Sequence, residues 1–382
     1  MKKIFVTGIT GLVGSAFVTA LSRDQKGTKF VCLTRKSPVK SAYDRVYDIV
    51  KEQCEFDGVP ELFDEIIGNI EVIDGDVTTI NPAEIAKLPE MEGVNSMFHC
   101  AADVNLGKDP TGKTFKINYN GTENMIALAK ILNLKEFHYV STAYVAGKTI
   151  GRAMEAKPTC NEFNNPYESS KFQSEGLVRE CGIPFTIYRP GIITGRLEDG
   201  KIRKPLAFYR ILEFLAKLKS NSCAKAGVNP AEEYDLNIHF NTVASERIYF
   251  TPIDYVQYAI NKIFQQEVKN ETFHVTGDSP VTTDMIDRAI CRVLKLKYME
   301  VSKSNEDDLN KGSKMLERFI GDLFPYFAND VIFDQTNVRG ALGDEALAWT
   351  YDDRKMELMM REFFVKFFTN VPWVQELLDS TK

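Results

Sequence analysis

One stretch decides the fold of this 382-residue chain: Thr7-Gly8-Ile9-Thr10-Gly11-Leu12-Val13-Gly14. It follows the apolar run Ile4–Thr7, which predicts a buried strand, and it opens the run Leu12–Ser22, which predicts a helix. Glycines in such a loop let the backbone turn tightly and approach a pyrophosphate, while the helix N-terminus attracts negative charge. The spacing is Gly-x-x-Gly-x-x-Gly, not the Gly-x-Gly-x-x-Gly of the general fingerprint, so a turn without a ligand is the alternative interpretation. The strand–loop–helix context favours a dinucleotide site made by Gly8, Thr10, Gly11, Leu12, Val13 and Gly14.

Short apolar runs alternate with helical patterns through the first half of the chain. The predicted strands are Ile4–Thr7, Phe30–Leu33, Glu71–Ile73, Ser96–His99, Phe137–Ser141 and Phe185–Arg189. The predicted helices between them include Leu12–Ser22, Thr114–Leu132 and Tyr167–Cys181. Continuous apolar strands separated by helices imply a parallel sheet covered on both faces, so the sequence predicts an α/β, doubly wound Rossmann fold.

The pattern changes after Gly195. A strand–helix pair over Ile248–Gln265 and a strand over Thr272–Thr276 should return to the main sheet, and from Pro280 onward the pattern is mostly helical. We therefore expect a dinucleotide-binding Rossmann domain and a smaller, mostly helical C-terminal domain that binds substrate or acts as a lid. The expected boundaries are residues 1–200 plus 248–276 for the first domain, and residues 201–247 and 277–382 for the second.

Composition argues against several function classes. A net charge of −6 argues against nucleic acid as the main partner, because phosphate neutralisation needs a basic surface. Seven scattered cysteines without a C-x-x-C pair suit reduced thiols, and the four histidines have no ligand-like spacing, so we expect no metal site. No uncharged apolar run is long enough to cross a bilayer, and glycines interrupt the N-terminal apolar stretch too early for a signal peptide. We expect a soluble, cytoplasmic protein whose contact with membranes is at most peripheral.

The end of the second predicted strand bears on the choice of dinucleotide. It reads Cys32-Leu33-Thr34-Arg35-Lys36. Sites that prefer NAD usually hold the ribose 2′-hydroxyl there with a carboxylate, whereas an arginine accommodates a 2′-phosphate. Two cations and no carboxylate favour NADPH, with solvated loop charges as the alternative interpretation of Arg35 and Lys36. Asp76, after the third strand, fits either a hydrogen bond to the adenine amine or a turn or helix cap.

Tyr167 and Lys171 are a candidate catalytic pair. They lie four positions apart, so the predicted helix stacks both side chains on one face. A nearby ammonium favours the phenolate and lowers a phenol pKa that otherwise lies near ~10. A tyrosine tuned in this way can give or take a proton at neutral pH. The same spacing on an arbitrary helix gives only a surface aromatic beside a solvated lysine, so the rest of the chain gives the pair its weight.

These stretches together resemble the extended short-chain dehydrogenase/reductase superfamily. The matching motifs, in chain order, are the Gly8–Gly14 loop, Asp76-Val77, Ala101-Ala102, Asn118 before Gly121-Thr122, Ser141-Thr142, and Tyr167 with Lys171. The stretches His99–Asn105, Val140–Gly147 and Tyr188–Gly195, and the long insertion Ser37–Gly68, are similar to the thioester reductase branch. That branch includes fatty acyl-CoA reductases and the terminal reductase domains of carboxylic acid reductases and nonribosomal peptide synthetases. The present sequence contains no adenylation or carrier segment, which leaves the acyl donor open.

The resemblance implies roles for the site residues. Thr142 would hydrogen-bond the substrate oxygen, and Tyr167 would give it a proton as hydride reaches the carbon. Lys171 would hold the nicotinamide ribose and keep the pKa of Tyr167 low. Asn118 would shape the helix near the site. The remaining residues expected at the cofactor are Arg35, Lys36, Asp76, Val77, Ala101, Ala102, Pro190, Gly191 and Ile192, the last three beside the nicotinamide carboxamide.

The expected reaction is the NADPH-dependent reduction of an acyl thioester, carried by CoA or a carrier protein. Hydride attack gives a hemithioacetal oxyanion, which Thr142 and Tyr167 would stabilise, and its collapse leaves an aldehyde that a second NADPH could reduce to the alcohol. The alternatives on this scaffold are a ketone or aldehyde reductase and an NDP-sugar epimerase or dehydratase. A non-catalytic NADP(H)-binding sensor is the alternative of another class. The acyl group, its carrier, the number of electrons and the oligomeric state stay open.

The segment Lys201–Lys225 is basic within an acidic chain. Its cations are Lys201, Arg203, Lys204, Arg210, Lys217, Lys219 and Lys225. They fit either contact with a phosphorylated acyl carrier or a solvated helix face. The apolar residues of this segment, and those of the later run Met356–Phe368, fit either an acyl-chain pocket or core packing.

Overall fold

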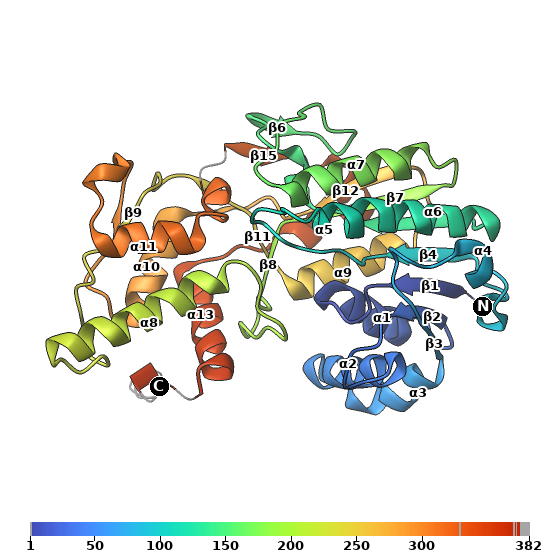
Figure 1. Cartoon of the computed structure of the whole chain (residues 1–382), viewed down its shortest axis with the longest axis horizontal. Helices are drawn as coiled ribbons and strands as arrows, with labels where there is room; N and C mark the ends of the chain where they lie inside the picture. The colour runs from blue at the N-terminus through green and yellow to red at the C-terminus, as the bar shows by residue number, and fades with distance from the viewer. Residues whose placement is uncertain (1, 328–329, 370, 372, 375–382) are drawn as a thin grey trace. The chain divides into compact units, whose positions relative to one another are not determined.

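A seven-stranded parallel sheet carries the glycine loop, with strand order β12-β7-β5-β4-β1-β2-β3 (Figure 1). Its strands are β1 (Lys3–Thr7), β2 (Lys29–Thr34), β3 (Ile70–Asp74), β4 (Ser96–His99), β5 (Glu136–Val140), β7 (Phe185–Pro190) and β12 (Glu271–Val275). The strand order runs outward in both directions from β1, which pairs with β2 on one side and β4 on the other. In open sheets of this kind ligands bind at the carboxyl ends of the strands where the order reverses. The computed structural model thus confirms the predicted doubly wound Rossmann fold.

The register of the sheet aligns the polar ends of its central strands. Thr7 of β1 pairs with His99 of β4, and His99 pairs with Tyr139 of β5. Val140, the last residue of β5, pairs with Tyr188 of β7. The residues that follow these strands therefore emerge at the same edge of the sheet.

Helices cover both faces of the sheet. Figure 1 shows α5, α6 and α7 along one face and α1, α2 and α9 along the other. The helix bounds are α1 (Leu12–Asp24), α2 (Ala42–Phe56), α3 (Phe63–Gly68), α4 (Pro82–Ile85), α5 (Lys113–Phe115), α6 (Gly121–Ile131), α7 (Pro166–Glu180), α9 (Ile253–Phe264) and α12 (Thr336–Leu342). On the α1 side Phe17 stacks on Phe98 with 3.7 Å between ring centroids, and Phe264 meets Phe17 edge-on at 4.8 Å. These contacts fix α1, and with it the glycine loop, against β4.

The structure describes residues 2–327, 330–369, 371 and 373–374. Internal contacts divide the chain into unit 1, which contains the sheet, and unit 2. Unit 1 comprises Met1–Gly191, Val256–Val275 and Phe333–Ala346, and unit 2 comprises Ile192–Tyr255, Thr276–Ile332 and Leu347–Lys382. The contacts thus group Phe333–Ala346 with the sheet, whereas the sequence analysis assigned this stretch to the smaller domain.

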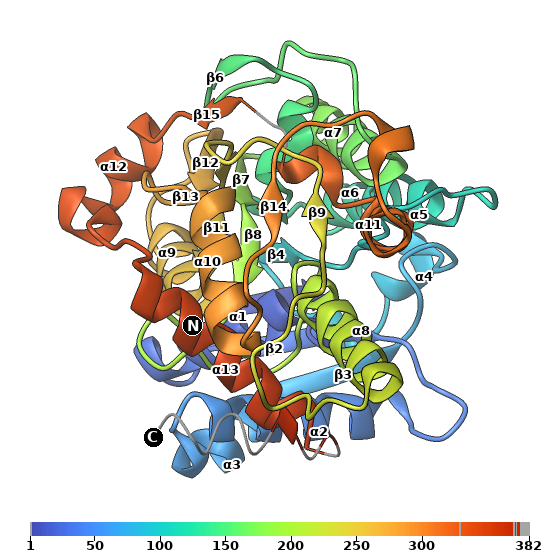
Figure 2. The ribbon, with the colours of Figure 1, turned by 90° about the vertical axis from the view of Figure 1, so that its left-hand side faces the viewer.

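Unit 2 is built from helices and two-stranded sheets. Its helices are α8 (Tyr209–Ala226), α10 (Thr283–Leu294), α11 (Lys311–Ile320) and α13 (Asp353–Phe367). Its paired strands are β8 (Ile192–Thr194) with β11 (Phe250–Pro252), β10 (Arg247–Ile248) with β13 (Val281–Thr282), and β9 (His239–Phe240) with β14 (Glu300–Val301), the last pair side by side in Figure 2. The remaining strands are β6 (Gly151–Ala153) and β15 (Val331–Phe333).

One strand prediction was wrong. Thr272–Thr276 joins the main sheet as β12, as expected, but the strand residues of Ile248–Gln265 pair with β13 and β8 instead. β7 ends at Pro190, which has no amide hydrogen to donate to a neighbouring strand. The chain keeps its contact with Val275 of β12 through Gly191 and then leaves the main sheet. It resumes as β8, and β11 pairs with that continuation.

The apolar runs of unit 2 form its core. On α8, Ile211, Leu212 and Leu215 are buried, and on α13 the buried residues are Met356, Met359, Met360, Phe363 and Phe364. The rings of Tyr209 and Phe363 lie 4.9 Å apart. Core packing is thus the interpretation that these side chains support. In the part of the chain that is described, no helix combines the length and apolarity needed to cross a bilayer.

Candidate active site

The glycine loop has the geometry of a phosphate cradle. Gly8 has a φ of +80°, and a Cβ there would lie 2.6 Å from the backbone nitrogen of Ala101. A Cβ on Gly14 would run into the carbonyl oxygen of Gly8. Gly11 donates to the Gly8 carbonyl at 2.9 Å and is the N-cap of α1, where it offers no side chain to cover the helix end. The loop and helix N-terminus therefore fit the pyrophosphate of a dinucleotide.

Arg35 and Asp76 meet across the carboxyl ends of β2 and β3. Nη1 of Arg35 lies 3.1 Å from Oδ2 of Asp76, and the arginine side chain remains 59% exposed. Asp76 also accepts from the backbone nitrogen and the hydroxyl of Thr78, both at 2.9 Å. Burial raises the pKa of Asp76, but the bonds from Thr78 and Arg35 together hold it below its usual value. The structure thus shows Asp76 as a turn cap and as the ion-pair partner of a reachable guanidinium.

Two other predicted cofactor residues lie beside this pair. The backbone nitrogen of Lys36 donates to Oδ1 of Asp74 at 2.9 Å, and its side chain is 76% exposed. Val77 is buried and packs towards α6, because a Cβ on Gly121 would lie 2.8 Å from its Cγ2. Val77 therefore supports the site from within the core.

Asn118 connects the loop after β4 to helix α7. It lies in the π-helical turn Lys116–Asn120, a local widening often found at functional sites. Its Oδ1 accepts from the backbone nitrogen of Asp103 at 2.8 Å, and its Nδ2 donates to the Asp103 carbonyl at 3.1 Å and to the Ser170 hydroxyl at 2.9 Å. This bonding matches the helix-shaping role that the resemblance implies.

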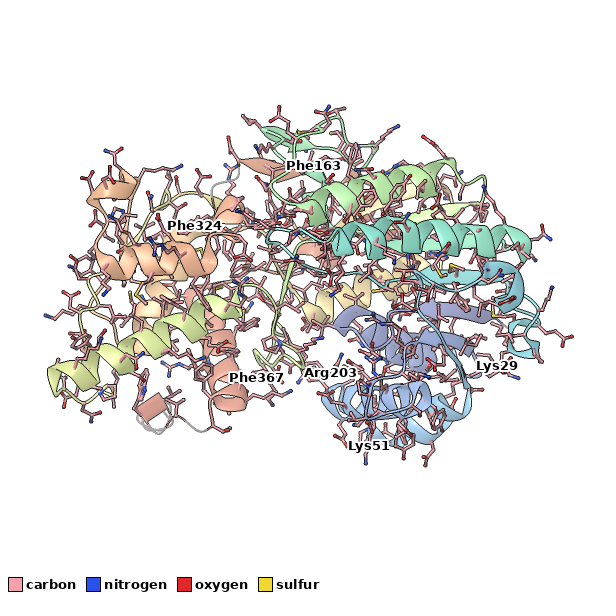
Figure 3. The ribbon with its side chains drawn as sticks, viewed as in Figure 1. Lys29, Lys51, Phe163, Arg203, Phe324 and Phe367 are labelled. Atoms are coloured by element: carbon pink, nitrogen blue, oxygen red, sulfur yellow. The ribbon has the colours of Figure 1, made fainter. Side chains whose placement is uncertain are left out.

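Thr142, Tyr167 and Lys171 come together at the carboxyl end of β5. Tyr167 is in the first turn of α7, whose N-cap Asn165 accepts from the Glu168 nitrogen at 3.0 Å. The Thr142 hydroxyl lies close enough to the phenol of Tyr167 to lower its pKa. Nζ of Lys171 donates to the carbonyl of Val140 at 2.6 Å. Phe163, labelled in Figure 3, lies in the loop before α7, and its ring is 5.0 Å from that of Phe172 on this helix.

The electrostatics of this trio differ from the expectation. Burial, with the neighbouring Tyr139, raises the pKa of Tyr167 above its ordinary value, and only the hydrogen bond with Thr142 among the nearest groups lowers it. The ammonium of Lys171 faces the Val140 carbonyl and lies 4.1 Å from the centre of the Tyr139 ring. Burial lowers the pKa of Lys171 to about 7. The phenol is therefore protonated at neutral pH, and the predicted lowering of its pKa by Lys171 is not found in this arrangement.

A family comparison fits this geometry. The family described as male sterility protein matches residues 6–260. The chain belongs to this family. The male sterility family is a nicotinamide-dinucleotide-binding branch of the extended short-chain dehydrogenase/reductases, so the predicted membership of the thioester reductase branch is confirmed.

Individual relatives are distant. Aldehyde reductase lnaA of Aspergillus flavus is 25% identical over 284 residues, which are 68% of this chain and 24% of that protein. Fatty acyl-CoA reductase wat of Drosophila melanogaster is 28% identical over 223 residues, which are 50% of this chain and 43% of that protein. The chain therefore spans less than half the length of either relative. The terminal R domain from the myxalamid PKS-NRPS biosynthetic pathway shares the fold, with a TM-score of 0.74, 21% identity, and coverage of 96% of this chain and 92% of that one.

A buried ion pair anchors α7 in this chain, and the sequence analysis did not predict it. Arg189 of β7 donates to Glu175 of α7 through Nε at 2.9 Å and Nη2 at 2.7 Å, and both residues are 1% exposed. The predicted cofactor residues Pro190 and Gly191 come directly after Arg189 in the chain. Gly191 donates to the Val275 carbonyl at 3.4 Å, and Ile192 is the first residue of unit 2. An arginine inside an apolar strand was the available signal, since such a residue is almost never buried without a partner.

Among the seven cations of the basic segment, Lys201, Arg210 and Lys217 pair with carboxylates, and Arg203 and Lys219 are buried. Arg210 donates to Asp322 at 2.6 Å, Lys217 pairs with Glu213 on the next turn, and Lys201 lies 3.5 Å from Asp199. Lys219 is fully buried and donates to the carbonyl of Leu294 at 2.7 Å. Arg203, labelled in Figure 3, is also buried. The structure thus favours a structural role for these cations over contact with a phosphorylated carrier.

Proposed function

We propose that this chain is an NADPH-dependent reductase that converts an acyl thioester into an aldehyde. The acyl group would be carried as a thioester of CoA or of a carrier protein. The observation that carries the proposal is the convergence of Thr142, Tyr167 and Lys171 at the end of β5, with a phenol that holds its proton. The names of two relatives, an aldehyde reductase and a fatty acyl-CoA reductase, support reductive chemistry on a carbonyl. The fold shared with a terminal R domain of a PKS-NRPS pathway supports a thioester as substrate.

The residues of unit 1 provide a proton donor and an oxyanion site. NADPH, when bound, supplies the hydride. The hydroxyls of Thr142 and Tyr167 are neutral donors that can hold the carbonyl oxygen and stabilise the charge that develops there. Tyr167 gives its proton to that oxygen as hydride reaches the carbon, and its raised pKa keeps it protonated for this step. When the resulting hemithioacetal collapses, its hydroxyl proton goes to the departing sulfur, so the products are the aldehyde and the free thiol. Lys171 reaches the same strand end and can replace the lost proton, because its pKa lies near the working pH.

The glycine loop and the β2 end would hold the dinucleotide. Gly8, Gly11 and the N-terminus of α1 would bind the pyrophosphate, with Thr10, Leu12, Val13 and Gly14 completing the loop. Ala101 abuts Gly8, and Ala102 follows it on the same loop. Arg35 and Lys36 supply the positive charge that favours a 2′-phosphate, although the ion pairs of Arg35 with Asp76 and of Lys36 with Asp74 make the net charge of this corner smaller than the sequence indicates. We infer a preference for NADPH over NADH from the two exposed cations.

A parallel substrate assay tests the function. Oxidation of NADPH is followed with acyl-CoAs, the same acyl groups on a carrier protein, free aldehydes and nucleotide sugars, and products are identified by mass spectrometry. The proposal expects aldehyde formation from a thioester. Turnover of free aldehydes alone would instead support the second candidate, an aldehyde reductase, which the Aspergillus relative favours. Turnover of nucleotide sugars alone, or binding of NADPH without any turnover, would reject both.

The role of the phenol has a matched control. Tyr167→Phe removes only the hydroxyl and should lower kcat at least a hundredfold, the range expected for a positioned general acid. NADPH affinity should change little, because the hydroxyl is not needed to hold the ring. Tyr258→Phe makes the same change at an exposed position on α9 and should leave kcat unaltered. Equal activity of Tyr167→Phe and the wild type would show that another group supplies the proton.

A further inference from the structure

A chain of buried polar side chains runs from the glycine loop to helix α7 through a histidine that the proposed mechanism does not use. Each member is at most 1% exposed: Thr7 of β1, His99 of β4, Thr122 of α6, Asn118 of the π-helical turn, and Ser170 and Ser174 of α7. All of them lie in unit 1. A buried network with every group hydrogen-bonded holds its members in one arrangement, and here it joins the two ends of the site.

The hydrogen bonds of Thr122 fix the proton on one nitrogen of His99. The Thr122 hydroxyl lies 2.6 Å from the carbonyl oxygen of Asn118 and 3.0 Å from Nε2 of His99. A carbonyl oxygen can only accept, so the single hydroxyl proton of Thr122 points to Asn118. The hydroxyl oxygen must then accept from the imidazole, and Nε2 must carry a hydrogen.

The hydrogen bonds of Thr7, at the other ring nitrogen, lead to the same tautomer of His99. Oγ1 of Thr7 lies 3.3 Å from the backbone nitrogen of Cys100 and 3.2 Å from that of Ala101. Backbone N–H groups only donate, so they use the hydroxyl oxygen as acceptor and leave its proton for Nδ1 of His99, 2.6 Å away. Nδ1 is therefore the bare nitrogen, which is the tautomer that Thr122 requires.

The surroundings of His99 disfavour a second proton. The side chains that face the ring include Tyr139, whose centroid is 5.6 Å away, and Phe137 at 6.2 Å. Burial, together with the nearby Lys171 ammonium, lowers the pKa of His99 to about 3. Since Nδ1 already receives the Thr7 proton, a second proton on the ring would also break that bond.

We propose that His99 is a positioning residue, held as the neutral Nε2–H tautomer, which couples the backbone under the cofactor loop to the catalytic helix. Through Thr7 it holds Cys100 and Ala101, whose backbone abuts Gly8. Through Thr122 it holds the carbonyl of Asn118, which also lies 2.9 Å from the hydroxyl of Ser174 on α7. The same Ser174 hydroxyl lies 2.7 Å from the Ser170 carbonyl, so its single proton is shared between these two acceptors. The assignment of the first end to a cofactor and of the second end to catalysis rests on the proposed function, whereas the tautomer does not.

The link from Asn118 reaches the first turn of the catalytic helix. The Ser170 hydroxyl donates to the Tyr167 carbonyl at 2.8 Å and accepts from Nδ2 of Asn118. A shift of Asn118 therefore moves the carbonyl of the proposed proton donor. Every bond between His99 and Tyr167 has one allowed direction, so the chain has no second arrangement of equal energy.

Nitrogen NMR of the histidine side chains in the cofactor-free chain tests the tautomer directly. His274 is a control within the same chain, because its Nδ1 lies 2.8 Å from the Asp334 carbonyl and its Nε2 accepts from Arg189 at 3.2 Å, which requires the opposite tautomer. We expect His99 to show a bare Nδ1 and a protonated Nε2, unchanged from about pH 5 to about pH 8, where free histidine titrates. His99→Gln assigns the signal. A protonated Nδ1, or titration in this range, would overturn the proposal, and neither result depends on the reductase function.

Two substitutions of His99 test its hydrogen bonds to Thr7 and to Thr122 separately. His99→Gln keeps a donor for Thr122 and loses the acceptor for Thr7, so it should weaken NADPH binding about tenfold, as expected for one buried hydrogen bond. His99→Asn keeps an acceptor for Thr7 and loses the donor to Thr122. It should leave the Kd for NADPH within about twofold and speed amide hydrogen exchange at Ser170–Ser174 about tenfold. Equal effects of both variants on both measurements would show a merely structural histidine. If neither variant folds, the wild-type spectrum still decides, with the His99 ring assigned by correlation to its own backbone instead of by substitution.

Discussion

Arg189→Met should destabilise unit 1 by about 3–5 kcal/mol, because it leaves the carboxylate of Glu175 buried without its main counter-charge. Both side chains are 1% exposed and are joined by two short hydrogen bonds. The same guanidinium also holds the loop that precedes α7, since it donates to the carbonyls of Met154 at 3.1 Å and Ala156 at 2.8 Å. Methionine fills a similar volume but offers no donor to any of these oxygens.

The loss of unfolding free energy caused by Arg189→Met should become smaller as the pH falls. Burial raises the pKa of Glu175, but Arg189 and Arg179 together hold it below its ordinary value. In the wild type, the contribution of the pair is present above the unfolded pKa near ~4.3 and disappears as the pH falls through the folded pKa. Without Arg189 the effect of burial dominates, so the carboxyl of the variant takes up a proton at a higher pH and loses its penalty. The gap in unfolding free energy should therefore narrow from about pH 7 to about pH 5.

Urea unfolding followed by circular dichroism at several pH values measures this gap. Glu175→Gln in the Arg189→Met background should recover part of the loss at neutral pH, because a neutral amide costs less to bury than an unpaired carboxylate. Arg23→Met, at an exposed pair with Asp24, is the control and should change stability by no more than about 0.5 kcal/mol. A loss below about 1 kcal/mol for Arg189→Met, the range of surface pairs, would refute the reasoning, as would a gap that does not vary with pH.

Three further outcomes follow from the site. Gly14→Ala places a Cβ against the Gly8 carbonyl and should weaken NADPH binding at least tenfold by calorimetry, whereas Gly68→Ala, with open space around it, should leave binding unchanged. Arg35→Ala should weaken NADPH about tenfold or more, the value of one charge-assisted hydrogen bond, and should leave NADH nearly unaffected; equal losses for both would show that Arg35 does not contact the 2′-phosphate. Burial lowers the pKa of Lys171 to about 7, so the unfolded chain binds more protons between that value and about 10, and stability should rise with pH across this window. Lys171→Met should flatten that rise, and identical slopes in both proteins would contradict it.

The main sheet was predictable because buried parallel strands are continuous apolar runs. Ser96–His99 was predicted with its observed bounds, and each of the other six strands differs from the structure by one residue at one end or at both ends. The small paired strands of unit 2 were not, since stretches of two or three residues such as Arg247–Ile248 carry no periodic signal. The pairing of β8 with β11 depends on where the chain leaves the main sheet after Pro190, which is a tertiary effect.

The parts of the site that depend on backbone position could be predicted from the sequence. The contacts made by long side chains could not. Helical spacing brought Tyr167 and Lys171 to the same strand end as Thr142. The same spacing did not reveal that the Lys171 ammonium extends to the Val140 carbonyl, because a four-carbon side chain goes to the nearest acceptor in three dimensions. The Arg35–Asp76 ion pair was likewise hidden, since it joins the ends of two strands that are neighbours only in the folded sheet.

The buried face of α7 explains why so much of the site was visible and so much of its support was not. Its buried residues, Tyr167, Glu168, Ser170, Lys171, Ser174, Glu175 and Val178, recur mostly at the three- and four-residue spacing of a core-facing stripe. A stripe of this kind normally carries leucine or valine, but here almost every position is polar. Such a face gains little from the hydrophobic effect, so the helix must be held by specific partners, and the structure supplies them: Asn118 for Ser170, Val140 for Lys171, and Arg189 for Glu175. Polar residues at core spacing on a helix therefore indicate a functional helix in a sequence, but their partners come from other strands and appear only in the fold.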